Sequence, residues 1–577
     1  MKKFIPIAII LLAVFFRFYH WENYCFGFDQ VQTLENAEKI LHGKLTLIGP
    51  KGGPAALFIG PLLYYLTAAF MFFISSPLAV NASALFISFM TGLTLFFLTK
   101  RYLNSSQGLI TLSLWAFSPF LINQDRIPWA SNLSFLSASL VFFPLLYSFE
   151  NKLRFKDIFF IAIGVFLGYQ AHFAGLFLYP LILFATLFLK QKIKLIFAST
   201  AGLCLTILPT FLFDLRHQWL NLQGVKSLFF TQVNPQNYLP VIVRFKVNLY
   251  ITIENLGKII FFSNSNLLIV FSGAVLFLFA CFLLAQKKQK IKVFFTLSWS
   301  IIIAILFLVY KDIPPDYYFL VQFPALIYLL TLLFEQILNT SKKRLVALAI
   351  FSVYSFFYTK NFSTPKELTI GNQVKAIKYL KSLSQKNPIK KINYDMELVY
   401  FPGFQYLLKD FKLDPQGQEI VITYPFVKGH LVTANFFPIG IYFDQRIKQD
   451  KNYLTMPNYL ISTPKDVFLY EDSYRKTYLS SNQVFIITLN QQNLGLLLVF
   501  GPQESNKFLS ALSIQKNTQS FLPPPWTNLT IQLEIGYGFV CNYNLFFITP
   551  RSEAERPKLL DLLEDIQVVT VGSEVCS

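Results

Sequence analysis

The stretch KQKIKLIFASTAGLCLTILPTFLF, residues 190–213, sets three lysines directly before an apolar run. A run of about 20 apolar residues is long enough to cross the hydrocarbon core of a bilayer as a helix. Similar groups of Lys and Arg stand beside other apolar runs, at Lys2-Lys3, Lys100-Arg101, Lys152-Arg154-Lys156, Lys287-Lys288-Lys290-Lys292 and Lys342-Lys343-Arg344. Because cytoplasmic loops collect cations, we expect all six groups on the cytoplasmic side of a membrane.

The composition is typical of a polytopic α-helical membrane protein. Of the 577 residues, 54% are hydrophobic and 17% aromatic, and the mean hydropathy is +0.47. A soluble domain does not need so much apolar surface. The net charge of +19 is also compatible with nucleic-acid binding, but the cations lie in short loops, where anionic lipid headgroups are the expected partner. We therefore expect membrane lipids, and no nucleic acid, as partners.

The number of membrane spans follows from the charges. Apolar stretches occur at 4–18, 57–75, 79–98, 108–123, 131–149, 158–170, 174–189, 195–213, 267–285, 293–310, 319–338 and 345–358. If all of them crossed, the basic groups after 57–75 would lie opposite Lys2-Lys3, against the charge rule. If 57–75 stays on the outer face, about eleven spans remain, the N-terminus is cytoplasmic and the C-terminus is outside. We expect the first span to be uncleaved, because bulky residues follow it.

The stretch Leu57–Ser75 is therefore expected to be an interfacial helix on the outer face. Its Pro61, Tyr64 and Tyr65 suit that level. Aromatic rings with a polar tip prefer the boundary between membrane and water.

These assignments divide the chain into a transmembrane module, residues 1–359, and an extracytoplasmic domain, residues 360–577. Two outer segments of the module, 19–78 and 214–266, are too long to be simple connections. In the domain we expect a helix at Asn372–Ser384. Strand-like runs separated by Gly, Pro and Asn lie at Glu419–Tyr424, Val484–Leu489, Leu494–Phe500, Leu529–Ile535 and Leu545–Ile548. The expected fold class is a polytopic helical membrane protein with a C-terminal α+β domain.

The first outer segment holds the carboxylate that we single out, Asp29. It stands at the start of an expected helix in which Val31, Leu34, Ala37 and Leu41 share one apolar face. In one interpretation Asp29 is the N-cap, which satisfies free backbone N–H groups. In the other, a carboxylate at a rigid helix start accepts a proton during catalysis. The two roles are compatible.

Cysteine and histidine give no metal signal. No pattern of these residues has metal-ligand spacing, so we expect no metal site. Cys25, Cys541 and Cys576 fall on the expected outer side, where disulfides are permitted. Spacing alone leaves open whether Cys541 and Cys576 pair.

Several runs resemble the signature of one group of membrane enzymes. In the first outer segment these runs are Phe28-Asp29-Gln30, Ile40–Pro50 and Gly60–Leu66. Further runs follow in the same order: Ser118-Pro119 with Arg126 and Trp129, Phe213-Asp214-Leu215-Arg216-His217, and Asp316-Tyr317-Tyr318-Phe319 with Pro324. Together they resemble the polytopic GT-C glycosyltransferases related to protein O-mannosyltransferases and to the aminoarabinose transferase of lipid A.

This resemblance implies a GT-C fold with outer juxtamembrane helices. It also implies an inverting transfer of a sugar, of hexosyltransferase type, from a polyprenyl-phosphate donor to a glycan, lipid or protein acceptor on the outer face of the cell membrane. Asp29 matches the first-loop aspartate of the group, which implies a general base on the acceptor hydroxyl. The resemblance implies no nucleotide and no established catalytic metal, and we expect no cofactor, because the lipid-linked sugar is a substrate.

The remaining candidate residues divide into two sets. A leaving phosphate needs cations or N–H donors. The candidates for binding the donor phosphate and lipid carrier are Arg126, Arg216, His217, Arg244, Lys246, Tyr317 and Tyr318. The candidates for contact with acceptor or donor are Asp125, His172, Tyr64 and Tyr65.

Most of these candidates have a structural alternative. Asp125 and Arg126 could form a local ion pair, and His172 could simply lie at a span boundary. His217 could cap the end of a span. The adjacent tyrosines 317 and 318 could anchor the chain at the interface.

The sequence departs from the group's pattern at three places. Gln30 follows Asp29 where many relatives carry Glu, Ala130-Ser131-Asn132 replaces a common Asn-Pro pair, and Ile59 stands where a polar residue is frequent. These changes bear on acceptor and phosphate contacts more than on the reaction class.

Two other functions stay open on the sequence alone. An O-antigen polymerase or ligase would favour a large outer loop with catalytic Arg and His, and residues 214–266 keep that alternative open. A lipid-saccharide transporter with an external binding domain would be a non-enzyme. Transporters usually show two similar halves or paired broken helices, and this sequence has neither.

Overall fold

The structure is a computed structural model of the chain. It describes residues 4–52, 57–74, 77–230, 240–260, 266–285, 290–310, 314–360, 368–396 and 400–424, together with strands between 434 and 549. The fold divides into two compact units. Unit 1 comprises Met1–Ile377 and Pro402–Lys409, and unit 2 comprises Lys378–Phe401 and Asp410–Ser577.

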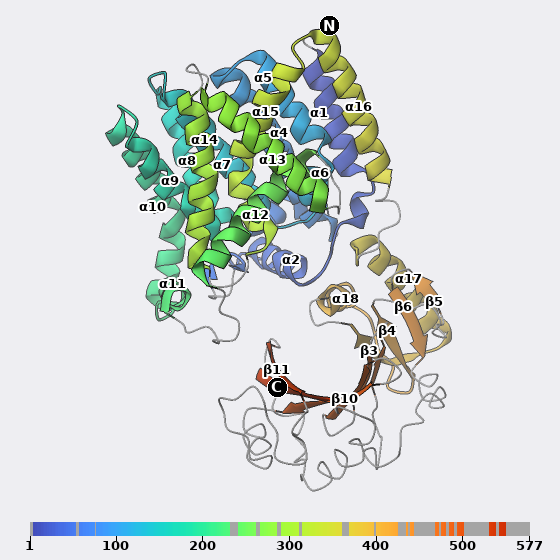
Figure 1. The fold of residues 1–577 in the computed structure, drawn as a ribbon. Coiled ribbons are helices and arrows are strands. Elements are labelled where there is room, and N and C mark those ends of the chain that lie inside the picture. The colour runs from blue at the N-terminus through green and yellow to red at the C-terminus, as the bar shows by residue number, and fades with distance from the viewer. Residues whose placement is uncertain are drawn as a thin grey trace. The chain divides into compact units, whose positions relative to one another are not determined.

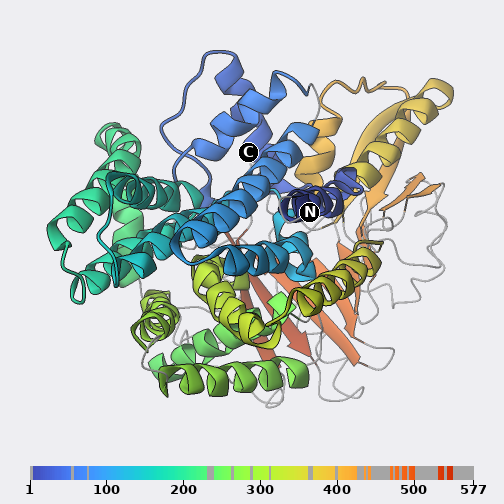
Figure 2. The same ribbon diagram turned by 90° about the horizontal axis from the view of Figure 1, so that it is seen from above.

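Unit 1 is a bundle of helices (Figures 1 and 2). The helices before the long outer segment are α1 (Phe4–Phe18), α2 (Phe28–Leu41), α3 (Leu62–Met71), α4 (Leu78–Tyr102), α5 (Ser105–Phe117), α6 (Pro119–Asp125), α7 (Leu133–Ser148), α8 (Phe155–Ala171), α9 (Leu178–Thr186) and α10 (Lys192–Arg216). Within that segment lie α11 (Leu220–Phe230) and α12 (Val241–Ile260), and after it come α13 (Asn266–Ala285), α14 (Lys290–Leu306), α15 (Phe323–Ile337) and α16 (Ser341–Thr359). Short 3₁₀ helices connect them: η1 (Trp21–Asn23), η2 (Ala130–Asn132), η3 (Phe173–Phe177), η5 (Phe307–Val309) and η6 (Asp316–Gln322).

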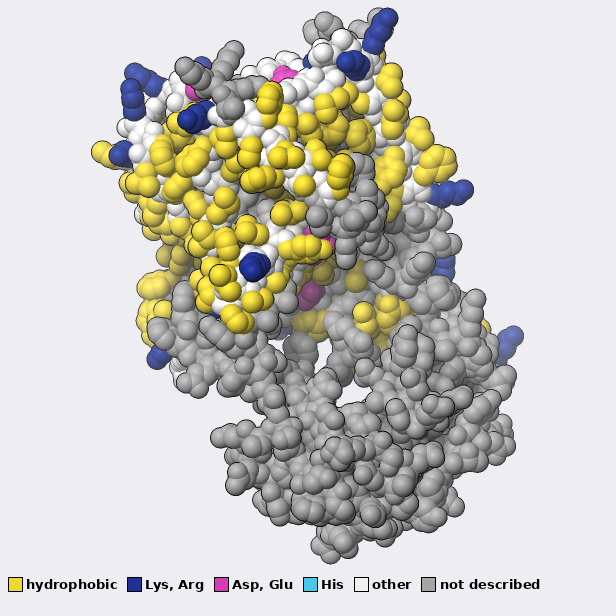
Figure 3. All heavy atoms as spheres, in the orientation of Figure 1, with side chains coloured by type: hydrophobic (Ala, Val, Ile, Leu, Met, Phe, Trp, Pro, Cys, Tyr) yellow, Lys and Arg dark blue, Asp and Glu magenta, His cyan; other side chains and the backbone are white. Residues whose placement is uncertain are grey.

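Each apolar stretch of the sequence coincides with one or more of these helices. Among the described residues, five helices are long and apolar enough to cross a membrane: Leu78–Tyr102, Ala130–Ser148, Lys192–Arg216, Lys290–Val309 and Asp316–Ile337. Hydrophobic side chains cover most of the described surface of unit 1 in Figure 3. Unit 1 is therefore a membrane-type helical bundle, whereas the count of eleven spans remains a prediction.

The central helix of the bundle is α7, which packs against α8, α4 and α15. Small residues allow α7 and α8 to come close. A Cβ on Gly164 would lie 2.6 Å from Val141 and 2.8 Å from the Ser137 carbonyl oxygen, so only glycine fits at 164. The Ser137 hydroxyl donates to the Gly164 carbonyl at 2.7 Å. Close packing of small residues is the usual way in which helices associate within lipid.

The predicted stretch 108–123 is broken into two helices. Ser118 ends α5 with extended backbone, and its hydroxyl accepts a hydrogen bond from the Leu121 N–H as the N-cap of α6. Pro119 occupies the first turn of α6, where its missing N–H loses no hydrogen bond. This break turns the chain toward Asp125 and Arg126.

Helices and strands both occur in unit 2 and in the chain that leads to it, and an α+β domain over residues 360–577 stays a prediction. Helix α17 (Ile370–Lys386) begins in unit 1 and continues into unit 2, and α18 (Phe401–Leu407) lies almost wholly within unit 1. Strands β3 (Ile389–Asp395), β4 (Gln418–Thr423), β5 (Ala434–Phe436) and β6 (Ile439–Phe443) form a sheet in the order β3-β4-β6-β5. In that sheet β3 and β4 are parallel and the other pairs are antiparallel.

A second sheet in unit 2 is antiparallel throughout. Its order is β11-β12-β10-β9-β8-β7, from β7 (Phe468–Glu471), β8 (Arg475–Leu479), β9 (Val484–Leu489), β10 (Asn493–Phe500), β11 (Thr530–Tyr537) and β12 (Asn542–Thr549). The predicted strand-like runs coincide with β4, β9, β10, β11 and β12. The possible pair Cys541–Cys576 lies outside the described residues.

Candidate active site around Asp29

Helix α2 places Asp29 in its first turn. The N-cap is Gly27, and the N–H of Gly27 donates to the Gln30 side-chain oxygen at 2.9 Å. The interpretation of Asp29 as the N-cap was therefore wrong, because Asp29 is the second residue of the helix and caps no N–H. A carboxylate in the first turn still interacts favourably with the helix dipole.

The apolar face of α2 fixes how Asp29 is presented. Val31, Leu34 and Ala37 are buried, as the sequence predicts, whereas Leu41 at the helix end is 38% exposed. In Figure 1, α2 lies at one end of the helix bundle of unit 1. Because its apolar face anchors the helix, Asp29 is held on a rigid support.

The Asp29 carboxylate is open to solvent and, among the described residues, has no hydrogen-bonded or ionic partner. Surrounding protein atoms nevertheless exclude enough water to raise the pKa of Asp29 above its ordinary value. The charge of Asp29 acts electrostatically on the hydroxyl groups of Tyr64 and Tyr317. An unpartnered carboxylate with a raised pKa beside polar groups has the properties of a general base.

An aromatic cluster from three connections lies beside Asp29. The ring centroids of Trp129 and Tyr317 are 4.6 Å apart, those of Tyr317 and Tyr318 are 4.8 Å apart, and those of His172 and Tyr318 are 4.0 Å apart. Trp129 follows α6, His172 precedes η3, and the two tyrosines lie on η6. The fold thus brings together four candidate or motif residues that are far apart in the sequence.

His172 is a structural member of this cluster. It is 6% exposed, and its Nδ1 accepts a hydrogen bond from the Ala174 N–H at 3.2 Å. Burial lowers the pKa of His172 to about 3, so the imidazole is neutral at ordinary pH. A Cβ on Gly175 would lie 2.0 Å from the Gly168 carbonyl oxygen, so glycine is required where η3 packs on α8. This geometry agrees with the boundary-residue interpretation of His172.

The Gly-Pro motif before α3 positions Tyr64. A Cβ on Gly60 would lie 2.0 Å from the Gln170 side-chain oxygen, so no larger residue fits. Tyr64 is 3% exposed and faces the neighbourhood of Asp29, as their electrostatic interaction indicates. The hydroxyl of Tyr65 instead donates to the backbone carbonyl of Thr46 at 2.9 Å, so Tyr65 holds the loop after α2.

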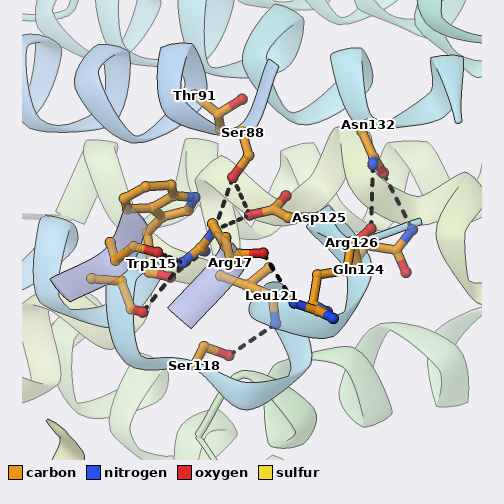
Figure 4. Close-up of polar contacts among 12 residues, drawn as sticks. Arg17, Ser88, Thr91, Trp115, Ser118, Leu121, Gln124, Asp125, Arg126 and Asn132 are labelled. Carbon is orange, nitrogen blue, oxygen red and sulfur yellow. Dashed lines mark hydrogen bonds and ion pairs between the residues drawn. The ribbon is translucent and has the colours of Figure 1, made fainter. Parts of the chain in front are cut away.

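Asp125 belongs to a buried network rather than to the site. Its carboxylate accepts hydrogen bonds from Arg17 Nε at 2.8 Å and from the Ser88 hydroxyl at 2.7 Å (Figure 4). Arg17 also donates to the Trp115 carbonyl at 2.9 Å and lies 4.1 Å from the centroid of that indole ring. The suggested local pair between Asp125 and Arg126 was wrong, because the partner of Asp125 is Arg17.

Arg126 is directed at the backbone. Its guanidinium donates to the carbonyl oxygens of Arg17, Tyr19 and His20 at 3.0, 2.6 and 2.9 Å. It also lies 4.6 Å from the centroid of the Tyr24 ring, and Arg126 is 4% exposed. These contacts engage the guanidinium within the protein, so we leave Arg126 out of the proposed donor site.

The predicted cations of the long outer segment differ in their surroundings. Arg244 is 5% exposed and donates to the carbonyls of Leu308 and Tyr310. Arg216, His217 and Lys246 are exposed, and the ring of His217 stacks on Phe213 at 3.9 Å. A donor-binding role for these residues stays a prediction.

Lys258 is a cation that the sequence analysis did not select. Its Nζ lies 2.9 Å from Glu254 and 3.3 Å from Asp316, and 5.6 Å from the centroid of the Phe120 ring. Burial alone would lower the pKa of Lys258, but the hydrogen bond that Lys258 donates to Glu254 and the charges of Asp316 and Glu254 raise it. Since Asp316 directly precedes Tyr317, the ion pair with Asp316 ties Lys258 to the aromatic cluster. The available signal was Glu254 four residues before it on the same helix.

Comparison with known proteins gives structural neighbours only. No protein-family model matches the chain, and no curated protein sequence matches it. The solved structure of ArnT from Cupriavidus metallidurans bound to undecaprenyl phosphate has a TM-score of 0.48 and 10% identity, and the match covers 94% of this chain and 97% of that one. An oligosaccharyltransferase from Archaeoglobus fulgidus has a TM-score of 0.44 and 14% identity over 70% of this chain and 61% of that one.

A second structure from the same archaeon, AglB with an inhibitory peptide and a dolichol-phosphate, has a TM-score of 0.41 and 13% identity. No residue role is transferred from these structures, and the site described above rests on the contacts of this chain.

Proposed function

We propose that this protein is a membrane glycosyltransferase that moves a sugar from a polyprenyl-phosphate carrier to an acceptor hydroxyl, with Asp29 as the general base. The observation that carries the proposal is the Asp29 carboxylate, which has no partner among the described residues, has a raised pKa and stands on a rigid helix beside an aromatic cluster. The motif resemblance supplies the reaction class, and the geometry supplies a residue able to do the chemistry.

The reaction follows from these groups. The acceptor hydroxyl donates a hydrogen bond to Asp29, which takes the proton as the acceptor oxygen attacks the anomeric carbon. The bond from that carbon to the phosphate oxygen breaks, and the lipid phosphate leaves with the electron pair. Attack from the opposite face inverts the anomeric configuration. Positioning of the two substrates and a general base each contribute orders of magnitude to such a step.

The aromatic cluster is the proposed sugar-binding surface. The half-buried Trp129–Tyr317 pair offers apolar ring surface for the C–H groups of a sugar ring, and the hydroxyls of Tyr317 and Tyr64 offer hydrogen bonds. Lys258 is the proposed contact for the leaving phosphate, because an ammonium on the same cluster stabilises the developing charge. Arg216, His217 and Lys246 remain further candidates.

The proposed orientation places the site outside the cell. With the basic groups in the cytoplasm, the chain has about eleven spans, a cytoplasmic N-terminus, and residues 360–577 outside. Helix α3 has ten residues and rises about 15 Å, roughly half of the hydrocarbon thickness, which supports its placement at the interface. We propose the cell membrane as the location, and a glycan, lipid or protein as the acceptor.

The test uses Asp29→Asn in membranes supplied with radiolabelled polyprenyl-phosphate sugar. Loss of the base should lower transfer by about 10²–10⁴-fold at an unchanged protein level and with a melting temperature no lower than that of the wild type. The matched control is Glu35→Gln, which neutralises an exposed carboxylate on the same helix and should leave transfer unchanged. Unchanged transfer by Asp29→Asn would remove Asp29 from the mechanism, and absence of transfer by the wild type would remove the proposed reaction with that donor.

A further inference from the structure

We propose that Arg126 is a positioning residue. It fixes the chain before Asp29, while the nearby Pro128 carbonyl holds Gln30, and together these contacts set Asp29 in register with the Trp129–Tyr317 pair. The inference deepens the proposed function and rests on it in one respect, namely that Asp29 is the base. The sequence pattern alone suggested a phosphate contact for Arg126. Its contacts point to the backbone of the first outer segment instead.

The first step is the turn that ends α1. His20 has φ 49°, a left-handed conformation that is uncommon for residues other than glycine. Carbonyl groups at the end of a helix lack partners within the helix. Three carbonyls of this turn, at residues 17, 19 and 20, all accept hydrogen bonds from the Arg126 guanidinium. Its planar fork of five N–H groups can bind several oxygens at once, which a lysine cannot reproduce.

The second step is the contact between Arg126 and Tyr24. The Tyr24 ring packs on the Arg126 guanidinium, and its hydroxyl donates to the Arg17 carbonyl at 2.7 Å. Tyr24 is 1% exposed. The Arg126 guanidinium thus contacts the chain from the end of α1 to Tyr24, and Tyr24 lies five residues before Asp29.

The third step is the contact of Gln30, the residue directly after Asp29, with Pro128. The Gln30 side-chain amide donates to the Pro128 carbonyl at 3.4 Å, while its oxygen accepts from the N–H of Gly27. Gln30 is 2% exposed. Residues 126 and 128 therefore hold the chain on both sides of Asp29, and the next residue, Trp129, is the one that packs on Tyr317.

The fourth step is the anchor of this short segment. Asp125 is held by Arg17 and Ser88 in the buried network of Figure 4, so the end of α6 cannot shift without breaking a buried ion pair. The segment 125–129 is consequently a rigid template that contacts residues on both sides of Asp29 and carries Trp129, which packs on Tyr317. A displacement of about 1 Å at such a site lowers a reaction rate by about a hundredfold.

The test combines kinetics with a measurement of geometry that does not need activity. Arg126→Lys and Arg126→Gln are assayed for transfer, and each is also placed in a cysteine-free background that carries Asp29→Cys and Tyr64→Cys. A short bifunctional maleimide then reports the approach of positions 29 and 64. We expect kcat to fall about ten- to a hundredfold with KM within about threefold in both variants. The rate of cross-linking should also fall in both.

Two further variants keep the test decisive. Lys39→Gln removes an exposed cation from α2 and should change neither kcat nor cross-linking. Tyr24→Phe keeps the ring on the guanidinium and removes only the hydrogen bond to residue 17, so it should fold and show a smaller change of the same kind. If Arg126→Gln fails to accumulate, Arg126→Lys and Tyr24→Phe carry the comparison.

The outcomes separate this inference from the proposed function. Normal kcat and normal cross-linking in Arg126→Lys would overturn the positioning role. A raised KM with unchanged kcat and unchanged cross-linking would also overturn it, because Arg126 would then act as a substrate contact. If the wild type transfers no sugar while the Arg126 variants still slow cross-linking, the proposed function fails and the positioning role stands.

Discussion

Asp125 and Asp29 are two carboxylates of unit 1 with opposite surroundings. Asp125 is 7% exposed and accepts hydrogen bonds from Arg17 and Ser88 within 2.8 Å. Asp29 is open to solvent, has no partner among the described residues and has a raised pKa. A buried carboxylate that is paired with a cation stabilises the packing of helices. A carboxylate without a partner can still accept a proton from a substrate. The comparison therefore distinguishes a structural acid from a chemical one by their partners.

The cations divide in the same way. Arg17, Arg126 and Arg244 are buried and directed at carbonyls or at Asp125. Lys258 is only partly buried and faces two carboxylates beside the aromatic cluster. These three guanidinium groups bind backbone carbonyls or Asp125, whereas the ammonium of Lys258 lies near the proposed chemistry.

The largest expected effect on stability comes from breaking the buried pair with Arg17→Met. The variant leaves Asp125 buried without its cation, which should lower the free energy of unfolding by about 3–5 kcal/mol. Thermal unfolding of the detergent-solubilised protein measures the loss. The double variant Arg17→Met/Asp125→Leu should recover most of it, since it removes both charges together. If the double variant instead loses the sum of the unfolding free energies lost by the two single variants, Arg17 and Asp125 do not stabilise the fold through their ion pair.

The next prediction concerns the pH dependence of transfer. Because Asp29 has a raised pKa and acts as a base, kcat/KM should fall as pH decreases, with a midpoint above the ordinary value of 3.8. His172 should add no step near 6.5, since its pKa is lowered to about 3 and it is already neutral there. An acid limb at or below 3.8, or one that persists in the residual activity of Asp29→Asn, would contradict the assignment.

The raised pKa of Asp29 also predicts how the stability of the fold depends on pH. The folded protein disfavours the ionised form of Asp29, so its contribution to stability is fully present below pH 3.8 and is lost as pH rises through the raised pKa. Asp29→Asn should therefore melt at a temperature equal to or above that of the wild type at neutral pH. The difference should vanish in acid.

Much of unit 1 could be predicted from the sequence, because long apolar runs bordered by cations specify helices locally. Asp29 could be found from its motif at a helix start. The partner of Asp125 could not, since Arg17 lies 108 positions away and only packing of α1 against α6 joins them. One signal was present: Arg17 is a lone cation at the expected outer end of the first span, where cations are usually absent.

The boundary between the two units also depends on contacts between residues that are far apart in the sequence. A change in composition suggested a boundary at residue 360, but residues 368–377 and 402–409 fold with unit 1. There the N–H of Ile370 donates to the Tyr24 carbonyl, and the Gln373 amide donates to the Phe26 carbonyl at 2.7 Å. These bonds pair polar groups across more than 340 positions, and local composition carries no information about them.

The smallest expected effect comes from an exposed ion pair on α2 itself. Glu38 accepts hydrogen bonds from the Tyr406 hydroxyl at 2.5 Å and from Lys409 Nζ at 2.9 Å, and the Lys409 side chain is 51% exposed. Water screens such a pair, so Lys409→Ala should lower the free energy of unfolding by at most about 1 kcal/mol, with a smaller loss at high salt. Thermal unfolding beside Arg17→Met measures both pairs under one set of conditions. Equal losses from the two variants would show that burial does not separate the two pairs, and the contrast between Asp125 and Asp29 would then need another physical basis.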